Sequence, residues 1–362
     1  MKFKNKISLT IILQIRDRFE FSCRWLNFAY QNKCSYNIYI ADGSENENLK
    51  NYIDKNKFYK ILNIQYVKTE YDKNWKLYCN KILAALKTIN TPYLLLADDD
   101  DFYHFENIQK CIDRLDDNKD LISCGANTIH FKIIDGIVSG KKIQFHKNVK
   151  SSYLSTSILD NINLYFRGSR GIYYCIHRSD KFKNGWILNN NQNFSNGRMT
   201  ELFMELYLLT CGKVEFINIP FYYRQYGSSI GNSALLSNDF LDEMLKFNWH
   251  KDINKIINII SKKISNINKT KISDVKLELI NGLKLYLRPW IINGINLRGN
   301  TSEDNLSRNL MIKNALKNGA FKNIYKTISI VKSYISSFLN YKIKLDKKEF
   351  LIILNFLKHY KR

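Results

Sequence analysis

The chain has 362 residues and a formal net charge of +23, and 45% of its residues are apolar. This composition is typical of a globular protein of one or two domains and excludes a largely disordered chain. No segment reaches the roughly 18 consecutive apolar residues that span a membrane, so we expect a protein that is soluble or peripheral to a membrane.

The first hundred residues alternate short apolar segments with segments of helical periodicity. Four apolar segments predict strands: Ser8–Ile15, Asn37–Ala41, Ile61–Val67 and Tyr93–Ala97. Two segments with an apolar stripe predict helices: Glu20–Gln31 and Asn74–Ile89. Strands that alternate with helices favour an α/β fold with a parallel sheet.

Acidic residues follow two of these predicted strands. Asp42 opens the turn Asp-Gly-Ser after the second strand, and Asp98–Asp101 follow the fourth. In open α/β sheets, ligands bind beyond the carboxyl ends of the strands. The sequence therefore predicts a binding site at this edge of the sheet.

Four adjacent carboxylates repel one another unless a cation or solvent screens them. After a buried strand they offer hard oxygen ligands, which suit Mg²⁺ or Mn²⁺ together with substrate phosphates. The alternative is a solvated acidic turn. An EF-hand that starts at Asp98 is excluded, because Tyr103 and Gln109 occupy the positions of its glycine and its glutamate.

The seven cysteines show no C-x-x-C spacing, and their number is odd. This pattern indicates reduced, mostly buried thiols in a cytosolic protein and gives no zinc site. The N-terminal segment MKFKNKISLTIILQIRDR contains only a short apolar run that ends in charges, unlike a cleaved signal peptide.

The order of ADGS at residues 41–44 and TPYLLLADDDDF at residues 91–102 resembles the GT-A fold of nucleotide-diphospho-sugar transferases, and glycosyltransferase family 2 most closely. The resemblance implies a Rossmann-like, mixed and mainly parallel sheet flanked by helices. The segment Gln14–Arg18 departs from the family's Pro-Thr-Tyr-Asn-Arg.

The resemblance also implies roles for the acidic residues. Asp98 would face the ribose side of the donor and assist as a metal ligand, Asp100 would be the main metal ligand, and Asp101 would support them. Asp42 would contact the nucleobase. The implied cofactor is Mg²⁺ or Mn²⁺.

Two later segments extend the resemblance. TELFMELYLLTCG at residues 200–212 is similar to the family's acceptor-side helix, which implies Glu201 as the catalytic base, with Glu205 one turn later as the second candidate. The alternative for Glu201 is an acidic residue favoured by the helix dipole. Arg224 would grip the donor pyrophosphate through its guanidinium, unless it is an ordinary surface charge.

A domain boundary is predicted between residues 1–233, the glycosyltransferase domain, and 234–362, a basic and mainly helical region. The second part has 24 Lys and Arg against 10 Asp and Glu. Helices are expected at Ser302–Phe338 and Asp346–Tyr360, and a loop at Ser265–Lys271. The apolar segment Phe350–Leu357, flanked by lysines, fits contact with an anionic membrane and equally fits a core helix.

We therefore expect a metal-dependent hexosyltransferase that moves a sugar from a nucleoside-diphosphate sugar to a hydroxyl of a saccharide or lipid-linked saccharide. The resemblance implies inversion and a role in bacterial surface polysaccharide or lipooligosaccharide synthesis. The enzyme would be cytoplasmic, either free or peripheral on the cytoplasmic face of the inner membrane.

Two alternatives stay open. A nucleotidyltransferase or another metal-dependent phosphotransfer enzyme would use the same carboxylates, but Gln14–Phe19 lacks the expected glycines. A non-catalytic nucleic-acid-binding protein would use the positive charge and the 23 Tyr and 21 Phe. Four adjacent aspartates on such a surface would repel the phosphates of a nucleic acid, so we expect no nucleic-acid partner.

Overall fold

The computed structural model describes residues 8–134, 137–139, 152–168, 170–226, 244, 247–298 and 356. Within this part of the chain, nine strands form one mixed sheet in the order β3-β2-β1-β4-β8-β6-β9-β5, with β7 paired to β6. The strands are β1 (Leu9–Ile15), β2 (Asn37–Asp42), β3 (Asn63–Lys68), β4 (Tyr93–Asp98), β5 (Phe102–Tyr103), β6 (Leu121–Ile134), β7 (Ile137–Ser139), β8 (Ile176–Arg178) and β9 (Lys213–Tyr226).

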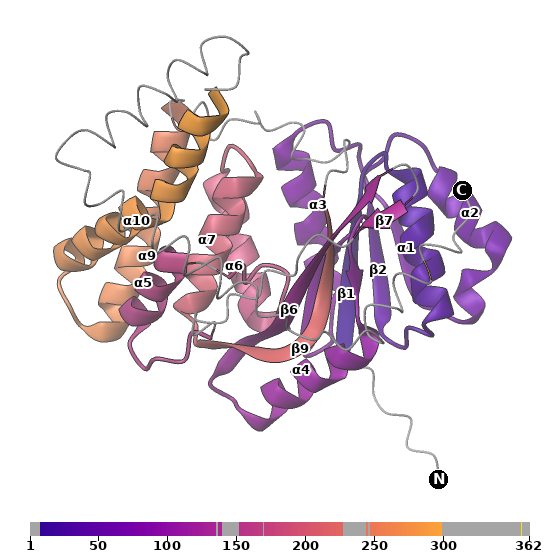
Figure 1. Ribbon diagram of the computed structural model, residues 1–362, viewed down its shortest axis with the longest axis horizontal. Coiled ribbons are helices and arrows are strands. Elements are labelled where there is room, and N and C mark those ends of the chain that lie inside the picture. Colours follow the sequence, from indigo (N-terminus) through magenta and orange to yellow (C-terminus); the bar gives the residue numbers. More distant parts are fainter. Residues whose placement is uncertain are drawn as a thin grey trace.

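Helices flank this sheet (Figure 1). They are α1 (Phe19–Gln31), α2 (Asn48–Asn56), the 3-10 helix η1 (Phe58–Lys60), α3 (Trp75–Thr88), α4 (Phe105–Asp117), α5 (Ile158–Gly168), α6 (Ser179–Gln192), α7 (Gly197–Leu209), α9 (Phe247–Asn268) and α10 (Ile272–Arg298). The predicted α/β class, with a mixed sheet flanked by helices, is confirmed. The first four long strands, β1 to β4, are mutually parallel.

The core lies on both faces of the sheet because successive side chains of a strand point to opposite sides. Ile11 and Leu13 of β1 belong to the apolar cluster that contains Trp25 of α1. Ile12, between them, belongs to the cluster that contains Ile82 of α3. Burial of each such side chain contributes about 1.5–3 kcal/mol, so β1 needs apolar residues at nearly every position.

The register of β1 brings the two acidic strand ends together. Ile15 pairs with Asp42 on one side of β1, and Gln14 pairs with Asp98 on the other. Because all three strands are parallel, both aspartates lie at the carboxyl edge of the sheet. The predicted meeting of the two acidic turns at one edge is confirmed.

The six elements predicted in the first hundred residues all form, with boundaries shifted by one or two residues. The third strand begins at Asn63 rather than Ile61. The reason is η1, which ends just before it and is closed by a hydrogen bond of 2.9 Å from Leu62 N to Phe58 O.

The predicted loop at Ser265–Lys271 is wrong in its first half, since α9 continues to Asn268. Its last turn follows Ile264, which is fully buried. The helix stops where Lys269 adopts a positive φ of 56°. Packing of the apolar stripe therefore outweighs the loop-like composition of this segment.

The described part of the C-terminal region packs directly against the preceding helices. α10 contacts α5, and α9 contacts α7. Trp249 and Ile260 of α9 and Leu279 of α10 belong to the same apolar cluster as Phe203 of α7. Among the described helices, none combines the length and the apolar character needed to cross a membrane.

The helices predicted at Ser302–Phe338 and Asp346–Tyr360 lie outside the described residues, apart from Phe356. The Phe356 side chain is buried. Its ring centroid lies 5.2 Å from that of Phe28 and 5.9 Å from that of Phe102. This one side chain of the apolar segment thus belongs to the core beside α1.

The seven cysteines all lie within the described residues. None of them forms a disulfide, and six are buried, while Cys211 is half-buried. Burial raises the pKa of the Cys34 and Cys79 thiols to about 12. The prediction of unpaired, mostly buried thiols is confirmed.

We predict that Gly282→Ala destabilises the contact between α10 and α5. A Cβ atom at residue 282 would lie 2.4 Å from the ring of Phe166, so one helix must shift. The expected loss is about 1–3 kcal/mol in the free energy of unfolding, measured by urea denaturation. Gly168→Ala is the control, because a Cβ atom there meets nothing within 4 Å. Equal stability of the two variants would contradict the prediction.

Candidate active site

The acidic loop after β4 gathers three of its four carboxylates. One oxygen from each of Asp98, Asp100 and Asp101 lies within 4.8 Å of the others. Ligand oxygens stand about 2 Å from a bound Mg²⁺ and hence up to about 4 Å apart. The three carboxylates are close to that spacing, and they are the three residues that the sequence predicted as metal ligands.

The fourth carboxylate, Asp99, turns to the start of α1. Its Oδ2 accepts a hydrogen bond of 3.0 Å from Ser22 Oγ, and its Oδ1 lies 3.1 Å from Arg18 Nη1. Burial raises the pKa of Asp99 to about 7, although the charge of Arg18 opposes this rise. Asp99 therefore fixes the loop to α1.

Asp98 is held by neighbouring polar side chains. The Gln14 amide donates to its Oδ1, and the Tyr174 hydroxyl donates to its Oδ2 at 2.7 Å. Gln14 in turn accepts a hydrogen bond from the hydroxyl of Tyr78. Burial, and then the charge of Asp100, raise the pKa of Asp98.

Asp101 is bound to β9 on the opposite side of the loop. It accepts hydrogen bonds from the Tyr222 hydroxyl and, at 2.7 Å, from the backbone N–H of Gln225. Burial and the neighbouring charge of Asp100 raise the pKa of Asp101. A divalent cation among the three oxygens would offset both the burial and the repulsion. The residues therefore fit Mg²⁺ or Mn²⁺.

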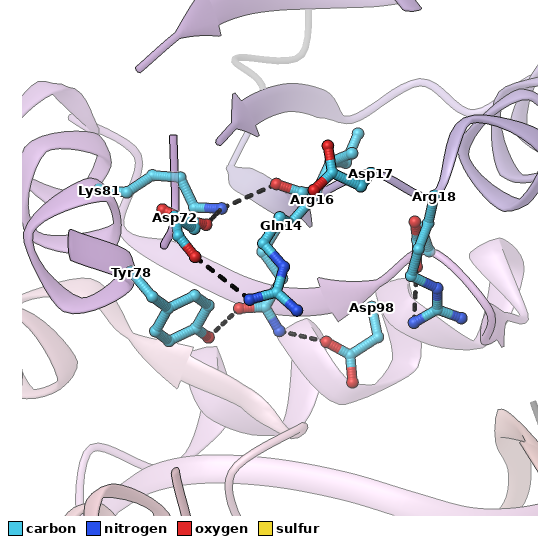
Figure 2. Close-up of a pocket in the computed structure, with 10 residues that line it drawn as sticks. Gln14, Arg16, Asp17, Arg18, Asp72, Tyr78, Lys81 and Asp98 are labelled. Atoms are coloured by element: carbon cyan, nitrogen blue, oxygen red, sulfur yellow. Dashed lines mark hydrogen bonds and ion pairs between the residues drawn. The ribbon is translucent and has the colours of Figure 1, made fainter. Parts of the chain in front are cut away.

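A cavity of about 240 Å³ opens beside Asp98 at the carboxyl end of β1. Figure 2 shows its walls, and three basic side chains are among them: Arg16, Arg18 and Lys81. This concentration of positive charge next to the acidic loop suits a ligand that carries phosphate groups.

A buried ion pair closes one end of this cavity. Lys81 Nζ contacts Asp72 Oδ2 and also donates to the carbonyl of Ile15 at 2.9 Å. Burial lowers the pKa of Lys81 and raises that of Asp72. A Cβ atom at residue 43 would lie 2.4 Å from the Asp72 carboxyl group, so this close approach requires Gly43.

Asp42, at the end of β2, is fully buried. Its Oδ2 accepts a hydrogen bond of 2.5 Å from the Tyr66 hydroxyl, and its Oδ1 accepts one of 2.8 Å from Ser44 N. Within the described residues, Oδ1 of Asp72 makes no hydrogen bond although it is buried. Asp72 lines the cavity, so it is better placed than Asp42 for direct contact with a ligand.

Glu201 lies in α7, near the helix start that Asn196 caps by accepting a hydrogen bond of 3.1 Å from Met199 N. The Glu201 side chain is exposed. Protein atoms crowd its carboxyl group, however, and the resulting desolvation, followed by the charge of Glu205, raises the pKa of Glu201 to about 7. Asp98 adds to this rise, which indicates that Glu201 lies in the field of the acidic loop.

Glu205, the second candidate for the base, has a structural role. Its Oε1 accepts hydrogen bonds from Ile172 N at 2.6 Å and Tyr173 N at 3.2 Å. Its Oε2 accepts one from the hydroxyl of Tyr165. The side chain is buried, so Glu205 holds the segment before β8 and Glu201 stays the available carboxylate.

Arg224 lies on β9, two residues after Tyr222, and its side chain is exposed. Its positive charge opposes the rise in the pKa of Glu201. Arg224 therefore belongs to the charged surroundings of Glu201 and of Asp101 in the acidic loop.

One further contact joins the helices on either side of this site. Trp75 Nε1, at the start of α3, donates a hydrogen bond of 3.1 Å to Thr200 Oγ1 of α7. A Cβ atom at residue 197 would lie 3.0 Å from the Trp75 ring. Gly197 thus allows the two helices to approach directly before Glu201.

Known proteins share the fold described above. Two solved structures of S. aureus TarS, residues 1–349, share the fold at 13% sequence identity. The complex with UDP-GlcNAc has a TM-score of 0.54 over 82% of this chain and 77% of that one. The complex with UDP has a TM-score of 0.50 over 78% and 72%. A search of the curated proteins gave no match.

Residues 25–176 match the family described as Glycosyl transferase family 2. Over these residues the chain is similar to family 2 glycosyltransferases, and its fold is of the GT-A type. The match includes the whole acidic loop and the helices on both sides of it. It favours the glycosyltransferase interpretation over the nucleotidyltransferase and the nucleic-acid-binding alternatives.

The sequence motifs do not indicate two features of this site. Arg18 was part of a segment that departs from the family pattern, yet it contacts Asp99 and Asp100. Asp72 and Lys81 were assigned to no site. The available signal for Arg18 was that two basic residues, Arg16 and Arg18, directly follow β1, which neighbours the acidic strand β4. Nothing in the sequence marks the buried pair of Asp72 and Lys81.

We predict that Asp100→Asn weakens Mn²⁺ binding at least tenfold, roughly 1.4 kcal/mol, because it removes a charged ligand from the three-carboxylate cluster. Titration calorimetry or the paramagnetic resonance of free Mn²⁺ measures the affinity. Asp117→Asn, on the exposed end of α4, is the control for loss of one negative charge. Unchanged affinity in the Asp100 variant would show that the cluster is not the metal site.

Proposed function

We propose that this glycosyltransferase transfers a sugar from a nucleoside-diphosphate sugar to a hydroxyl of a saccharide or lipid-linked saccharide, in a metal-dependent reaction with inversion. The supporting observation is the cluster of Asp98, Asp100 and Asp101 beside a cavity with basic walls. Carboxylates and cations side by side suit a diphosphate that is bound partly through a metal ion.

The donor would lie along the carboxyl edge of the sheet. Its diphosphate would lie near the three carboxylates and Arg18, with Arg224 closing over it from β9. Its base would enter the cavity toward Asp72, whose Oδ1 has no hydrogen bond among the described residues, with Asp42 behind. The bound UDP-GlcNAc of the similarly folded TarS supports a uridine diphosphate sugar as the first donor to try.

In the proposed reaction, the acceptor oxygen attacks the anomeric carbon as the bond from that carbon to the diphosphate oxygen breaks. Glu201 takes the hydroxyl proton, which a carboxylate with a pKa near 7 does efficiently at neutral pH. Bound Mg²⁺ or Mn²⁺ supplies positive charge against the departing diphosphate. Attack from the side opposite the leaving group inverts the anomeric centre.

The proposed setting is bacterial surface polysaccharide or lipooligosaccharide synthesis, with the enzyme peripheral to an anionic membrane. Exposed Leu277 and Leu285 on α10, beside exposed Lys284 and Arg288, support such contact. The buried Phe356 favours packing rather than membrane insertion for that side chain. α10 is therefore the better candidate for the membrane contact.

The function is tested by incubating the protein with a panel of nucleoside-diphosphate sugars and Mn²⁺ or Mg²⁺, and by following nucleotide release and thermal shift. At least one donor should stabilise the protein in a metal-dependent manner. Glu201→Gln should keep this stabilisation and lose at least a hundredfold in transfer rate, since general base catalysis contributes about 10²–10⁴-fold. Normal transfer by the variant would remove Glu201 from its proposed role.

We also predict the pH dependence of transfer. The base works unprotonated, and its pKa is raised to about 7, so the rate should rise with pH up to about 7. Below that value it should fall about tenfold per pH unit. Asp99, also near 7, would affect donor binding instead. Measuring kcat and donor affinity separately between pH 5 and 9 distinguishes the two, and a flat kcat profile would count against Glu201.

A further inference from the structure

Arg18 occupies an unusual position between two of the four aspartates. It lies at the N-terminal end of α1, its Nη1 is 3.1 Å from Asp99 Oδ1, and its Nη2 is 2.8 Å from Asp100 Oδ2. The side chain is only 14% exposed. The Arg18 guanidinium thus links Asp99, which anchors the loop to α1, with Asp100, which belongs to the three-carboxylate cluster.

The contact with Asp100 competes with a cation. Asp100 belongs to the cluster that fits Mg²⁺ or Mn²⁺, and its Oδ2 already lies against a positive charge. Two positive charges within about 4 Å of each other repel by several kcal/mol in a partly buried site. A cation that engages Asp100 therefore weakens the hold of Arg18 on the same carboxylate.

Arg18 has donors to spare for another acceptor. Within the described residues, its Nε is buried without a hydrogen bond, while its Nη2 makes the ion pair with Asp100. The ring of Phe21 supports the guanidinium at 4.4 Å, and Asp99 holds its other end. The side chain lines the cavity beside the acidic loop, so an incoming phosphate oxygen would accept a hydrogen bond from Nη2 once that nitrogen releases Asp100.

The loop itself does not depend on Arg18 alone. Arg24, one helical turn and a half further along α1, donates from Nη2 to the backbone carbonyl of Asp100 at 3.2 Å and to Gln225 Oε1 at 2.7 Å. Ser22 holds Asp99. The backbone of the loop can therefore keep its place when Arg18 changes partner.

We propose that Arg18 is an internal counter-ion of the acidic loop that exchanges partners: it neutralises Asp100 before a divalent cation binds, and then releases Asp100 and donates to a phosphate oxygen of the donor. The proposal rests on the proposed function of this site. It makes cation and donor binding mutually reinforcing, because each favours the position of Arg18 that the other needs.

A purely structural role makes a different prediction. If Arg18 only ties Asp99 to α1, its removal loosens the loop and weakens cation binding or leaves it unchanged. If Arg18 competes for Asp100, its removal strengthens cation binding in the absence of nucleotide. The sign of the change in cation affinity therefore decides between the two roles.

The experiment measures Mn²⁺ affinity by paramagnetic resonance for the wild type, Arg18→Met and Arg18→Lys, with and without UDP. We expect about tenfold tighter Mn²⁺ binding without UDP in Arg18→Met, and a smaller gain from UDP than in the wild type. Arg18→Lys should lie between, since a lysine keeps the charge but cannot span both carboxylates. Arg288→Met, on the exposed face of α10, is the matched control and should match the wild type.

Arg18→Lys also decides the matter if Arg18→Met does not fold. Mn²⁺ affinity that is unchanged or weaker in the folded Arg18 variants overturns the counter-ion role, and leaves the proposed function standing if the wild type still binds Mn²⁺ and a donor. A wild type that binds neither Mn²⁺ nor any nucleoside-diphosphate sugar overturns both.

Discussion

Four consecutive carboxylates at the end of a buried strand cannot all stay charged without positive charge beside them. Several kinds of group around Asp98–Asp101 help to meet this constraint. Arg18 lies against two of the four, and tyrosine hydroxyls and a backbone amide donate to two others. The pKa values of Asp98, Asp99 and Asp101 are nevertheless raised by burial. The protein's own groups thus do not fully compensate the negative charge of the loop. This uncompensated negative charge determines what the loop can bind.

The same constraint explains how the loop is supported. Groups from four different parts of the chain donate to it: Gln14 from β1, Ser22 from α1, Tyr174 from the segment before β8 and Tyr222 from β9. Such a distribution holds each carboxylate in its own direction, so mutual repulsion does not unfold the loop. Preorganised carboxylates bind a cation at lower cost, because little of the binding energy is spent on ordering them.

Local patterns were sufficient for the features that depend on one strand. The change from apolar YLLLA to four aspartates marks both the end of β4 and the acidic site, because a buried parallel strand must be apolar until it leaves the sheet. The common edge of Asp42 and Asp98 followed from the parallel arrangement of the strands. These predictions needed no knowledge of side-chain contacts.

Features that join distant segments could not be found in this way. The contact of Arg18 with Asp99 depends on the register of β1 against β4, and the pair of Asp72 and Lys81 depends on the path from β3 into α3. The loop predicted at Ser265–Lys271 failed for a related reason. Its asparagines and lysines favour a loop locally, but the buried Ile264 holds the helix against its neighbours, and that contact has no local signature.

The burial of Phe356 has a consequence for biosynthesis. Its partners Phe28 and Phe102 lie in α1 and directly after Asp101, so a side chain translated long after both of them completes the packing behind the acidic loop. At about 5–20 residues per second, that side chain follows Phe28 out of the ribosome only after some tens of seconds. Until then the nascent chain lacks this ring against Phe28 and Phe102, and a chain arrested before residue 356 would leave those rings without it.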